Sequence, residues 1–214
     1  MVLGDRQIKE AYENSEILIS PFDENQIQPA SYDLRVGEEA VTTSHEGIIN
    51  IKDKGFLKLK PGDFAVITVY EEIKLGPQYV GRFGLRSGYA RRGLIATTGP
   101  QIDPGYHGRL IVGITNLTPQ DITVAYLDKF LSVEFHKLDR AVLKPYSGPY
   151  QGRFKLSAEE IRIVAEKDGV PLVKVLQSVE EIRKEVHGLS TSTSLIKWVI
   201  GIGVPVLGVI LAIK

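Results

Sequence analysis

The sequence predicts a mainly β protein, a distorted jelly-roll or sandwich of antiparallel strands with short helices. Between residues 17 and 144, short β-branched and aromatic runs alternate with Gly, Pro, Asn and Asp, a spacing typical of such folds. Pro-Gly turns at 60–63 and 103–105 supply chain reversals. The chain has 214 residues, of which 43% are hydrophobic and 24% charged. That composition suits one domain with a sizeable core and an appendage.

The elements follow in order along the chain. Residues 1–14 are polar and have the pattern of a short amphipathic helix rather than of a signal peptide. β-Branched and aromatic residues then concentrate in several runs, in which we expect strands. The clearest of these runs are Phe64–Tyr70, Leu110–Ile114, Ile122–Tyr126 and Leu131–Phe135.

After Gly152 the hydrophobic period changes from that of strands to that of helices. Ser157-Ala158-Glu159-Glu160 has the form of a capping box, and Ile161, Val164 and Ala165 follow at helical spacing as far as Gly169. A second helical stretch is expected within residues 171–187. The sequence therefore predicts a domain over 1–155, a helical extension over 156–188 and a Ser/Thr-rich spacer over 189–194.

Residues 195–213 are apolar apart from Lys197, with Trp198 near the start and Pro205 inside. We expect this segment to be a transmembrane tail anchor, with the rest of the chain on the cytoplasmic face of a membrane. A buried core helix or an oligomerisation helix is the alternative. Its three interior glycines and one proline make it a poor soluble helix.

Composition excludes several function classes. Lys and Arg number 26, equal to Asp and Glu, so the net charge is zero and no basic face for nucleic acid is indicated. There is no cysteine, hence no disulfide and no thiolate metal site, as in many intracellular proteins. The four histidines are scattered and lack the spacing of a zinc deaminase. No Gly-x-Ser-x-Gly elbow for Ser-His-Asp catalysis is present either.

Two neighbouring motifs carry the chemistry. Arg86-Ser87-Gly88 offers a guanidinium, a hydroxyl and an unhindered backbone N–H, which together can bind phosphate oxygens. Asp103, at the start of a Pro-Gly turn, can orient a water or a sugar hydroxyl. The pair predicts a site for a phosphorylated sugar compound.

In these motifs the sequence resembles the trimeric dUTPase and dCTP deaminase superfamily. The resemblance fades after Gly152, and it implies a homotrimer with a nucleotide site. It is carried by residues 2–8, 27–37 (Ile-Gln-Pro-Ala-Ser-Tyr-Asp-Leu-Arg-Val-Gly), 86–94, 102–108, 116–117 and 130–135.

The resemblance also implies roles for single residues. Arg86, Ser87 and Gly88 would hold the phosphates of a deoxynucleoside triphosphate. Asp103 would hold the 3′-hydroxyl and orient the attacking water. The remaining implied contacts are Tyr106 on the deoxyribose, Arg91 near the water of the deaminase branch, Gln151 from a closing C-terminal segment and Asp33 in the second shell of a Mg²⁺ carried by the triphosphate.

The two branches of the superfamily differ at a few positions. The deaminase branch has a base glutamate where this chain has Gly113, and glycine cannot abstract a proton. Glu134, on another strand, is the nearby carboxylate. Arg-Ser-Gly at 86–88 and Tyr106 follow the dUTPase pattern. The deaminase tail motif Lys-Tyr-Gln-Gly-Gln has become Pro-Tyr-Gln-Gly-Arg over 149–153.

These differences favour a membrane-tethered dUTP diphosphatase that forms dUMP and pyrophosphate with Mg²⁺. A metal-free dCTP deaminase is the first alternative, because residues 2–8 and the Gln151-Gly152 pair are closer to that branch. A catalytically silent nucleotide-binding membrane protein is the second, because it would explain Gly113 and the altered tail together.

Overall fold

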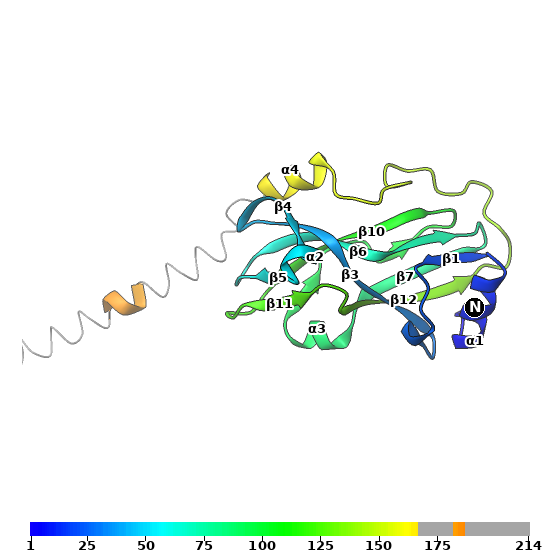
Figure 1. Cartoon of the computed structure of the whole chain (residues 1–214), viewed down its shortest axis with the longest axis horizontal. Helices are drawn as coiled ribbons and strands as arrows, with labels where there is room; N and C mark the ends of the chain where they lie inside the picture. Colours follow the sequence, from blue (N-terminus) through cyan, green and yellow to red (C-terminus); the bar gives the residue numbers. More distant parts are fainter. Residues whose placement is uncertain (167–181, 187–214) are drawn as a thin grey trace, which may run out of the picture. The chain divides into compact units, whose positions relative to one another are not determined.

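The computed structural model describes residues 1–166 and 182–186. The chain divides into two compact units, Met1–Asp168 and Gly169–Lys214. The first unit contains every strand of the described residues (Figure 1). In the second unit, residues 182–186 are helical.

Strands predominate in the first unit, as the composition of its runs predicts. The elements are α1 (Asp5–Glu13), β1 (Ile17–Ser20), η1 (Glu24–Gln26), β2 (Ile27–Gln28), β3 (Ser31–Thr42), β4 (His45–Asn50), α2 (Ile51–Lys54), β5 (Phe56–Leu59), β6 (Phe64–Leu75), β7 (Tyr79–Leu85), α3 (Ser87–Arg91), β8 (Leu94–Ala96), β9 (Gln101–Ile102), β10 (His107–Asn116), β11 (Ile122–Ala125), β12 (Lys129–Lys137) and α4 (Ala158–Glu166).

Ten of the described strands form one curled antiparallel sheet. Its main path is β8-β10-β6-β3-β12-β7-β9, with β1 on β6 and with β2 and β4 on β3, while β11 and β5 form a separate pair. A register shift between Val36 and Ala40 interrupts the pairing of β3 with β6, and such irregularities bend a strand. Because β3 pairs with both β6 and β12, it connects the two halves of the curled sheet.

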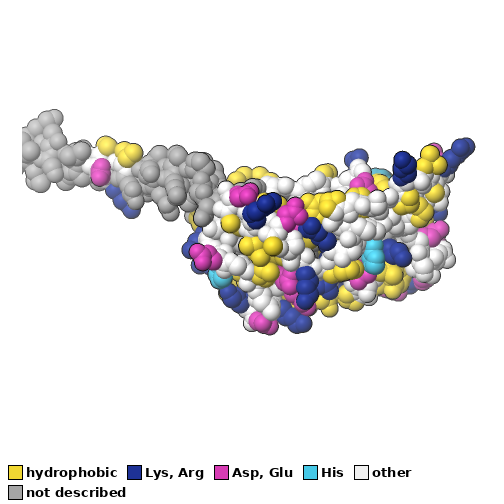
Figure 2. Space-filling view, turned by 90° about the horizontal axis from the view of Figure 1, so that it is seen from above, with side chains coloured by type: hydrophobic (Ala, Val, Ile, Leu, Met, Phe, Trp, Pro, Cys, Tyr) yellow, Lys and Arg dark blue, Asp and Glu magenta, His cyan; other side chains and the backbone are white. Residues whose placement is uncertain are grey.

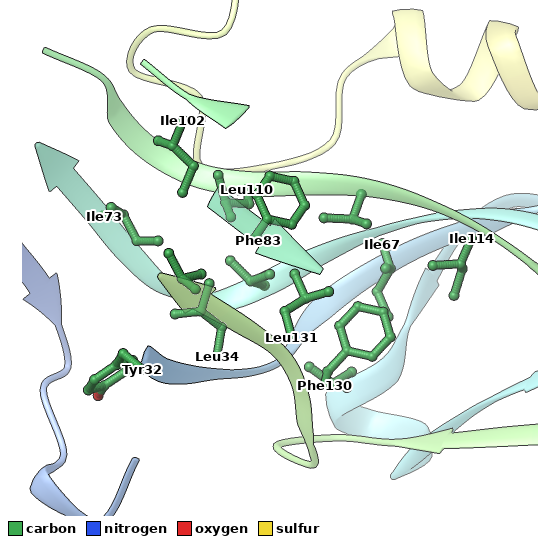
Figure 3. Close-up of a cluster of buried hydrophobic side chains, with 14 of the residues drawn as sticks. Tyr32, Leu34, Ile67, Ile73, Phe83, Ile102, Leu110, Ile114, Phe130 and Leu131 are labelled. Carbon is green, nitrogen blue, oxygen red and sulfur yellow. The ribbon is translucent and has the colours of Figure 1, made fainter. Parts of the chain in front are cut away.

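The core lies inside this curl, where inward-facing side chains of both halves meet (Figure 3). Tyr32, Phe130 and Phe135 are the largest fully buried side chains. Phe135 and Val133 alternate with the more exposed Ser132 and Glu134 on β12, the period-2 pattern of a strand with one buried face. The core therefore fixes the register of the central strands, since a slip of one residue would expose it.

The helices occupy the margins of the sheet. In Figure 1, α4 and α3 lie on opposite sides of it. Hydrophobic side chains of α4 and of the turn before it, Val164 and Leu156, pack on Val41, Phe64 and Val66 of β3 and β6. The α1 segment is held by a bond from Leu3 N to Phe135 O (2.9 Å).

The structure confirms the mainly β prediction and the helix that begins after Ser157. Three of the four expected strands lie within β6, β10 and β12, and the fourth, Ile122–Tyr126, extends one residue beyond β11. The predicted tail anchor, residues 195–213, and the spacer 189–194 lie outside the described residues. Among the residues that the structure does describe, no helix is long and apolar enough to span a membrane.

Candidate functional site

A cavity of about 580 Å³ lies between the sheet and the chain that follows β12. Its walls are largely apolar and aromatic, with contributions from Phe64, Phe83, Ile102 and Ile111. Such a mostly apolar pocket with a few polar groups is typical of small-molecule sites. Its polar lining side chains are Thr97, Thr98, Gln101, Asp103, Arg109 and Glu160.

Asp103 and Tyr106, two residues predicted from the sequence, both line this pocket. Asp103 Oδ1 accepts a hydrogen bond from Gln101 Nε2 (2.6 Å). The Tyr106 hydroxyl donates to the carbonyl of Arg109 (2.8 Å), and burial raises the pKa of Tyr106. Tyr106 is therefore a neutral, fixed wall beside the Asp103 carboxylate.

Gln151 reaches the pocket margin in a segment that we call the strap, residues 144–157. Gln151 Oε1 accepts from the amide of His107 (3.1 Å), and its Nε2 donates to the carbonyl of Gly105 (3.0 Å). Gly152 N adds a bond to His107 O (2.8 Å). Gln151 thus lies against the Asp103–Tyr106 turn.

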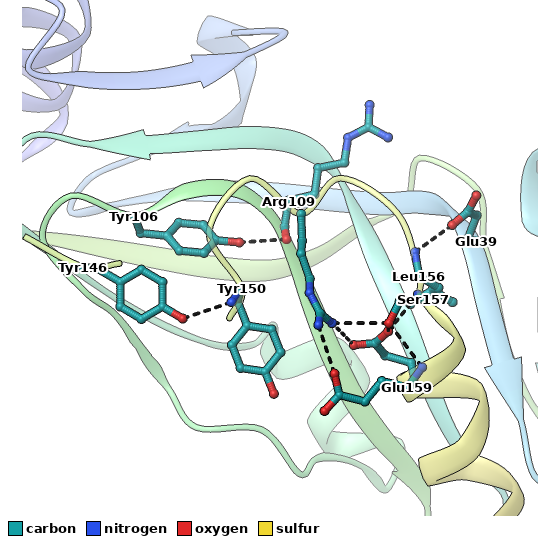
Figure 4. Close-up of polar contacts among 10 residues, drawn as sticks. Glu39, Tyr106, Arg109, Tyr146, Tyr150, Leu156, Ser157 and Glu159 are labelled. Carbon is teal, nitrogen blue, oxygen red and sulfur yellow. Dashed lines mark hydrogen bonds and ion pairs between the residues drawn. The ribbon is translucent and has the colours of Figure 1, made fainter. Parts of the chain in front are cut away.

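The strap and α4 are joined by a polar cluster (Figure 4). Arg153 Nη1 lies 2.6 Å from Glu160 Oε1, and Arg153 Nη2 lies 2.9 Å from Glu159 Oε2. Burial opposes ionisation of Glu160, but hydrogen bonds from Ser157 and the Arg153 charge outweigh it and lower the pKa of that carboxyl. Glu160 is therefore an anion that lines the pocket and is already paired.

Gly113 lies in the pocket wall with no room for a side chain. A β-carbon at this position would stand 2.7 Å from Thr97 Oγ1 and 3.1 Å from Phe64 Cε2. Both backbone groups of Gly113 are bonded: N donates to Thr98 Oγ1 (2.6 Å), and O accepts from Thr97 N (2.8 Å). A carboxylate at 113 would require these neighbours to move.

The phosphate-binding residues predicted at 86–88 belong to a second group, around α3. Arg86 Nη1 lies 3.1 Å from Asp33 Oδ2, and Ser132 Oγ donates to Asp33 Oδ1 (2.7 Å). A β-carbon at Gly88 would meet nothing within 4 Å, so the backbone there is open to a ligand. We call Arg86, Ser87 and Gly88 the anion loop. Arg91, also predicted, closes the same short helix.

Tyr89 fixes this short helix to the core. Its hydroxyl donates to Asp128 Oδ2 (2.9 Å), and its ring meets Phe130 edge-on at 5.7 Å. Arg86 N donates to the carbonyl of Phe130 (3.0 Å), and Val36 N donates to that of Asp128 (3.0 Å). The anion loop is thereby tied to β12 and, through Asp128, to β3, the strand that contains Asp33.

The pocket and the anion loop are separated within one copy of the chain. The anion loop contributes no residue to the pocket lining. Strand β7 pairs Arg82 with Gln101 and Gly81 with Ile102. With about 3.3 Å per residue, this register places Arg86 and Asp103 about 20 Å apart along the sheet. The structure therefore brings together Asp103, Tyr106 and Gln151, and separately Asp33, Arg86, Ser87, Gly88 and Arg91.

Sequence reasoning missed several pocket residues. Thr97 and Thr98 precede the Asp103 turn and carry no motif, although two adjacent hydroxyls before a Gly-Pro pair were a usable signal. Glu160 was predicted only as part of a capping box. Its second role depends on how α4 packs on the sheet, which local sequence does not encode.

The expected second-shell role of Asp33 toward a Mg²⁺ carried by the triphosphate stays a prediction. Asp33 is fully buried, and its two carboxylate oxygens face Ser132 and Arg86. Over the described ranges 1–166 and 182–186, no group of three or more His, Asp or Glu side chains could hold a metal ion. The Asp33 carboxylate lies 3.1 Å from the Arg86 guanidinium, to which it is the ion-pair partner.

Comparisons with known proteins place this geometry in a family. The model of the dCTP deaminase-like family matches residues 2–138. A protein named dCTP deaminase from Thermococcus sibiricus is 38% identical over 164 residues, which is 76% of this chain and 100% of the relative. A protein named dCTP deaminase, dUMP-forming, from Persephonella marina is 31% identical and covers 78% of this chain and 100% of the relative.

A solved structure supports the fold. The 2′-deoxycytidine 5′-triphosphate deaminase from Agrobacterium tumefaciens superposes with a TM-score of 0.54 at 19% identity. The match covers 63% of this chain and 47% of the Agrobacterium chain, less than half of that protein.

The expectation of a dUTP diphosphatase is wrong, because the curated relatives are named dCTP deaminases. That expectation depended on Gly88, Tyr106, Gly113 and the altered tail motif at 149–153. These are a few positions in short motifs, and they carry less weight than similarity over most of the chain. The resemblance to the superfamily itself is confirmed. Because the family model matches residues 2–138, the chain belongs to the dCTP deaminase-like family.

Proposed function

We propose that this protein binds dCTP and deaminates it, with water replacing the exocyclic amine at C4 of the cytosine ring. The observation that carries the proposal is the pocket beside Asp103 and Tyr106 in a chain 38% identical to a protein named dCTP deaminase along that relative's whole length. Asp103 would bind the 3′-hydroxyl, and Tyr106 would pack on the deoxyribose. The anion loop and Gln151 would contact the phosphates.

We propose that the complete site forms between copies in a homotrimer. Arg86 and Asp103 of one copy are about 20 Å apart along the sheet, given about 3.3 Å per strand residue. A second copy that presents its anion loop, with Arg91, at this pocket would supply the phosphate-binding groups. The open backbone at Gly88 supports this arrangement.

In the proposed function, Mg²⁺ would reach the site bound to the triphosphate of the substrate. Mg²⁺ prefers phosphate oxygens and keeps several waters, so the triphosphate would carry it into the site. Asp33 Oδ1 accepts a hydrogen bond from Ser132 and Oδ2 lies 3.1 Å from Arg86 Nη1, so Asp33 would act on such an ion only through water. Chelation of Mg²⁺ should accordingly weaken triphosphate binding and leave binding of deoxycytidine unchanged.

A second candidate function is nucleotide binding without turnover. It is favoured by Gly113, because the wall there has neither a carboxylate nor space for one. Loss of a positioned general base typically costs about 10² to 10⁴-fold in rate. Under this function the pocket binds the nucleotide and the chain acts through its bound state.

One experiment separates the two functions. Full-length protein is titrated with dCTP by calorimetry, and ammonia release is measured on the same sample. Binding with ammonia release supports deamination, and analysis for dUTP and dUMP identifies the product. Binding without ammonia supports the second function. Absence of dCTP binding contradicts both.

A further inference from the structure

The pocket is completed by chain that lies beyond the family-model match at residues 2–138. Tyr146 and Tyr150 of the strap and Glu160 and Ile163 of α4 all line it. Arg153 lies in the strap directly after Tyr150-Gln151-Gly152, with four residues between it and the start of α4. Its position makes it the candidate for joining them.

Arg153 binds the sheet through its backbone and α4 through its side chain. Its carbonyl accepts a hydrogen bond from Arg109 N (2.8 Å). A β-carbon at Gly108 would stand 2.6 Å from that carbonyl oxygen, so the strap can lie this close only on a glycine. The guanidinium pairs with Glu159 and Glu160 and also lies over the Tyr150 ring, 5.1 Å from its centroid.

In the ion pair between Arg153 and Glu160, the Glu160 carboxylate is held in place by its own hydrogen bonds. Its side chain is 6% exposed, and its Oε2 accepts hydrogen bonds from Ser157 N (2.7 Å) and from the Ser157 hydroxyl. The turn before α4 is itself bonded to β3 through Leu156 N and Glu39 Oε2 (2.9 Å). An arginine bound to a carboxylate held in this way loses most of its freedom.

The contacts of Gln151 are weaker. Its bonds to His107 N and Gly105 O lie at the exposed surface, where each is worth little against water. Ordering a strap residue costs backbone conformational entropy. A charged contact close in sequence adds to the backbone bonds that hold the strap in one place.

We propose that Arg153 is a positioning residue that holds the strap, and with it Gln151 and Tyr150, against the pocket by binding α4. The arginine, where the deaminase tail motif has glutamine, makes the helical extension part of the nucleotide site. A strap ordered before the ligand arrives costs less to close, so the ligand binds more tightly.

The test uses full-length Arg153→Gln, with Arg153→Lys as the conservative variant and Glu159→Gln as the matched control at the exposed partner. Hydrogen exchange is followed at two amides that link the strap to the sheet: Gly152 N, which donates to the carbonyl of His107, and Arg109 N, which donates to the carbonyl of Arg153. The amide of Val36, which donates to the carbonyl of Asp128, is the reference. We expect exchange at Gly152 and Arg109 to accelerate on the order of tenfold in Arg153→Gln, less in Arg153→Lys and little in Glu159→Gln.

The nucleotide arm of the test rests on the proposed function. The Kd for dCTP should rise on the order of tenfold in Arg153→Gln and recover partly in Arg153→Lys. Unchanged exchange at Gly152 and Arg109 with an unchanged Val36 overturns the proposal. Faster exchange at all three amides in Arg153→Gln would mean that the whole fold is loosened. In that case Glu160→Gln decides: acceleration at Gly152 and Arg109 but not at Val36 supports the proposal, and any other result overturns it. Absence of dCTP binding by the wild type overturns the proposed function instead, and the exchange result still decides the role of Arg153.

Discussion

The Thr97 side chain occupies the space that a side chain at Gly113 would need: a β-carbon at 113 would stand 2.7 Å from Thr97 Oγ1. We expect Gly113→Ala to lower the free energy of unfolding by about 1–3 kcal/mol through overpacking. Urea unfolding measures it. Gly88→Ala is the control, because its β-carbon meets nothing within 4 Å. Thr97→Ala in the Gly113→Ala background should recover part of the loss, and strict additivity of the two changes would refute the contact.

Asp103→Asn should leave the fold intact and impair the nucleotide site. The amide keeps the shape of the carboxylate but loses its charge, so turnover of dCTP should fall by roughly 10²-fold. Ammonia release and dCTP affinity are measured together with the unfolding midpoint. Asp139→Asn, at an exposed position outside the pocket lining, is the matched control. Wild-type turnover in Asp103→Asn would remove this residue from the mechanism.

The Arg153–Glu160 pair gives stability a defined pH dependence. The folded-state pKa of Glu160 is lowered, so its contribution is present above the unfolded pKa of about 4.3 and is lost as the pH falls through the folded value. At pH 7, Glu160→Gln should be less stable than wild type by about 1–3 kcal/mol. The difference should shrink on acidification. A difference that stays constant from pH 7 to pH 3 would show that the charge is not what matters.

Tyr89→Phe removes only the hydroxyl that bonds Asp128. The anion loop should then be held less firmly, so we expect the affinity for inorganic tripolyphosphate and for dCTP to fall about 3- to 10-fold, the equivalent of one hydrogen bond. Deoxycytidine, which has no phosphate, should bind as before. Tyr79→Phe, which loses a hydroxyl bond to Glu16 elsewhere, is the control. Equal losses for deoxycytidine and dCTP would contradict a role specific to the anion loop.

The membrane anchor at residues 195–213 stays a prediction from sequence. Full-length protein should sediment with membranes, and a chain ending at Gly188 should not, because the removed segment is apolar over a length close to that of a membrane span. The detergent dependence of sedimentation is the readout. A full-length chain that remains in the supernatant without detergent would disprove the anchor.

Local sequence predicted much of the fold and only half of the site. The strands at β6, β10 and β12 are evident because their β-branched and aromatic runs lie between Gly, Pro, Asn or Asp residues. Asp103 and Tyr106 lie together because one turn carries both. The distance between Asp103 and Arg86 was not predictable, since it is set by the pairing of β7 with β9. The roles of Thr97 and Glu160 likewise depend on tertiary packing, which no single motif encodes.

The register of β7 on β9 also has a consequence for how the protein behaves in solution. If phosphate-binding groups reach the pocket only from a neighbouring copy, nucleotide affinity becomes a function of protein concentration. Serial dilution would weaken dCTP binding although every copy stays folded, and nucleotide would in turn oppose dissociation of the copies. The amount of protein present in the cell would then set the threshold nucleotide concentration at which the site fills. On the face of the first unit seen in Figure 2, acidic and basic side chains are interspersed.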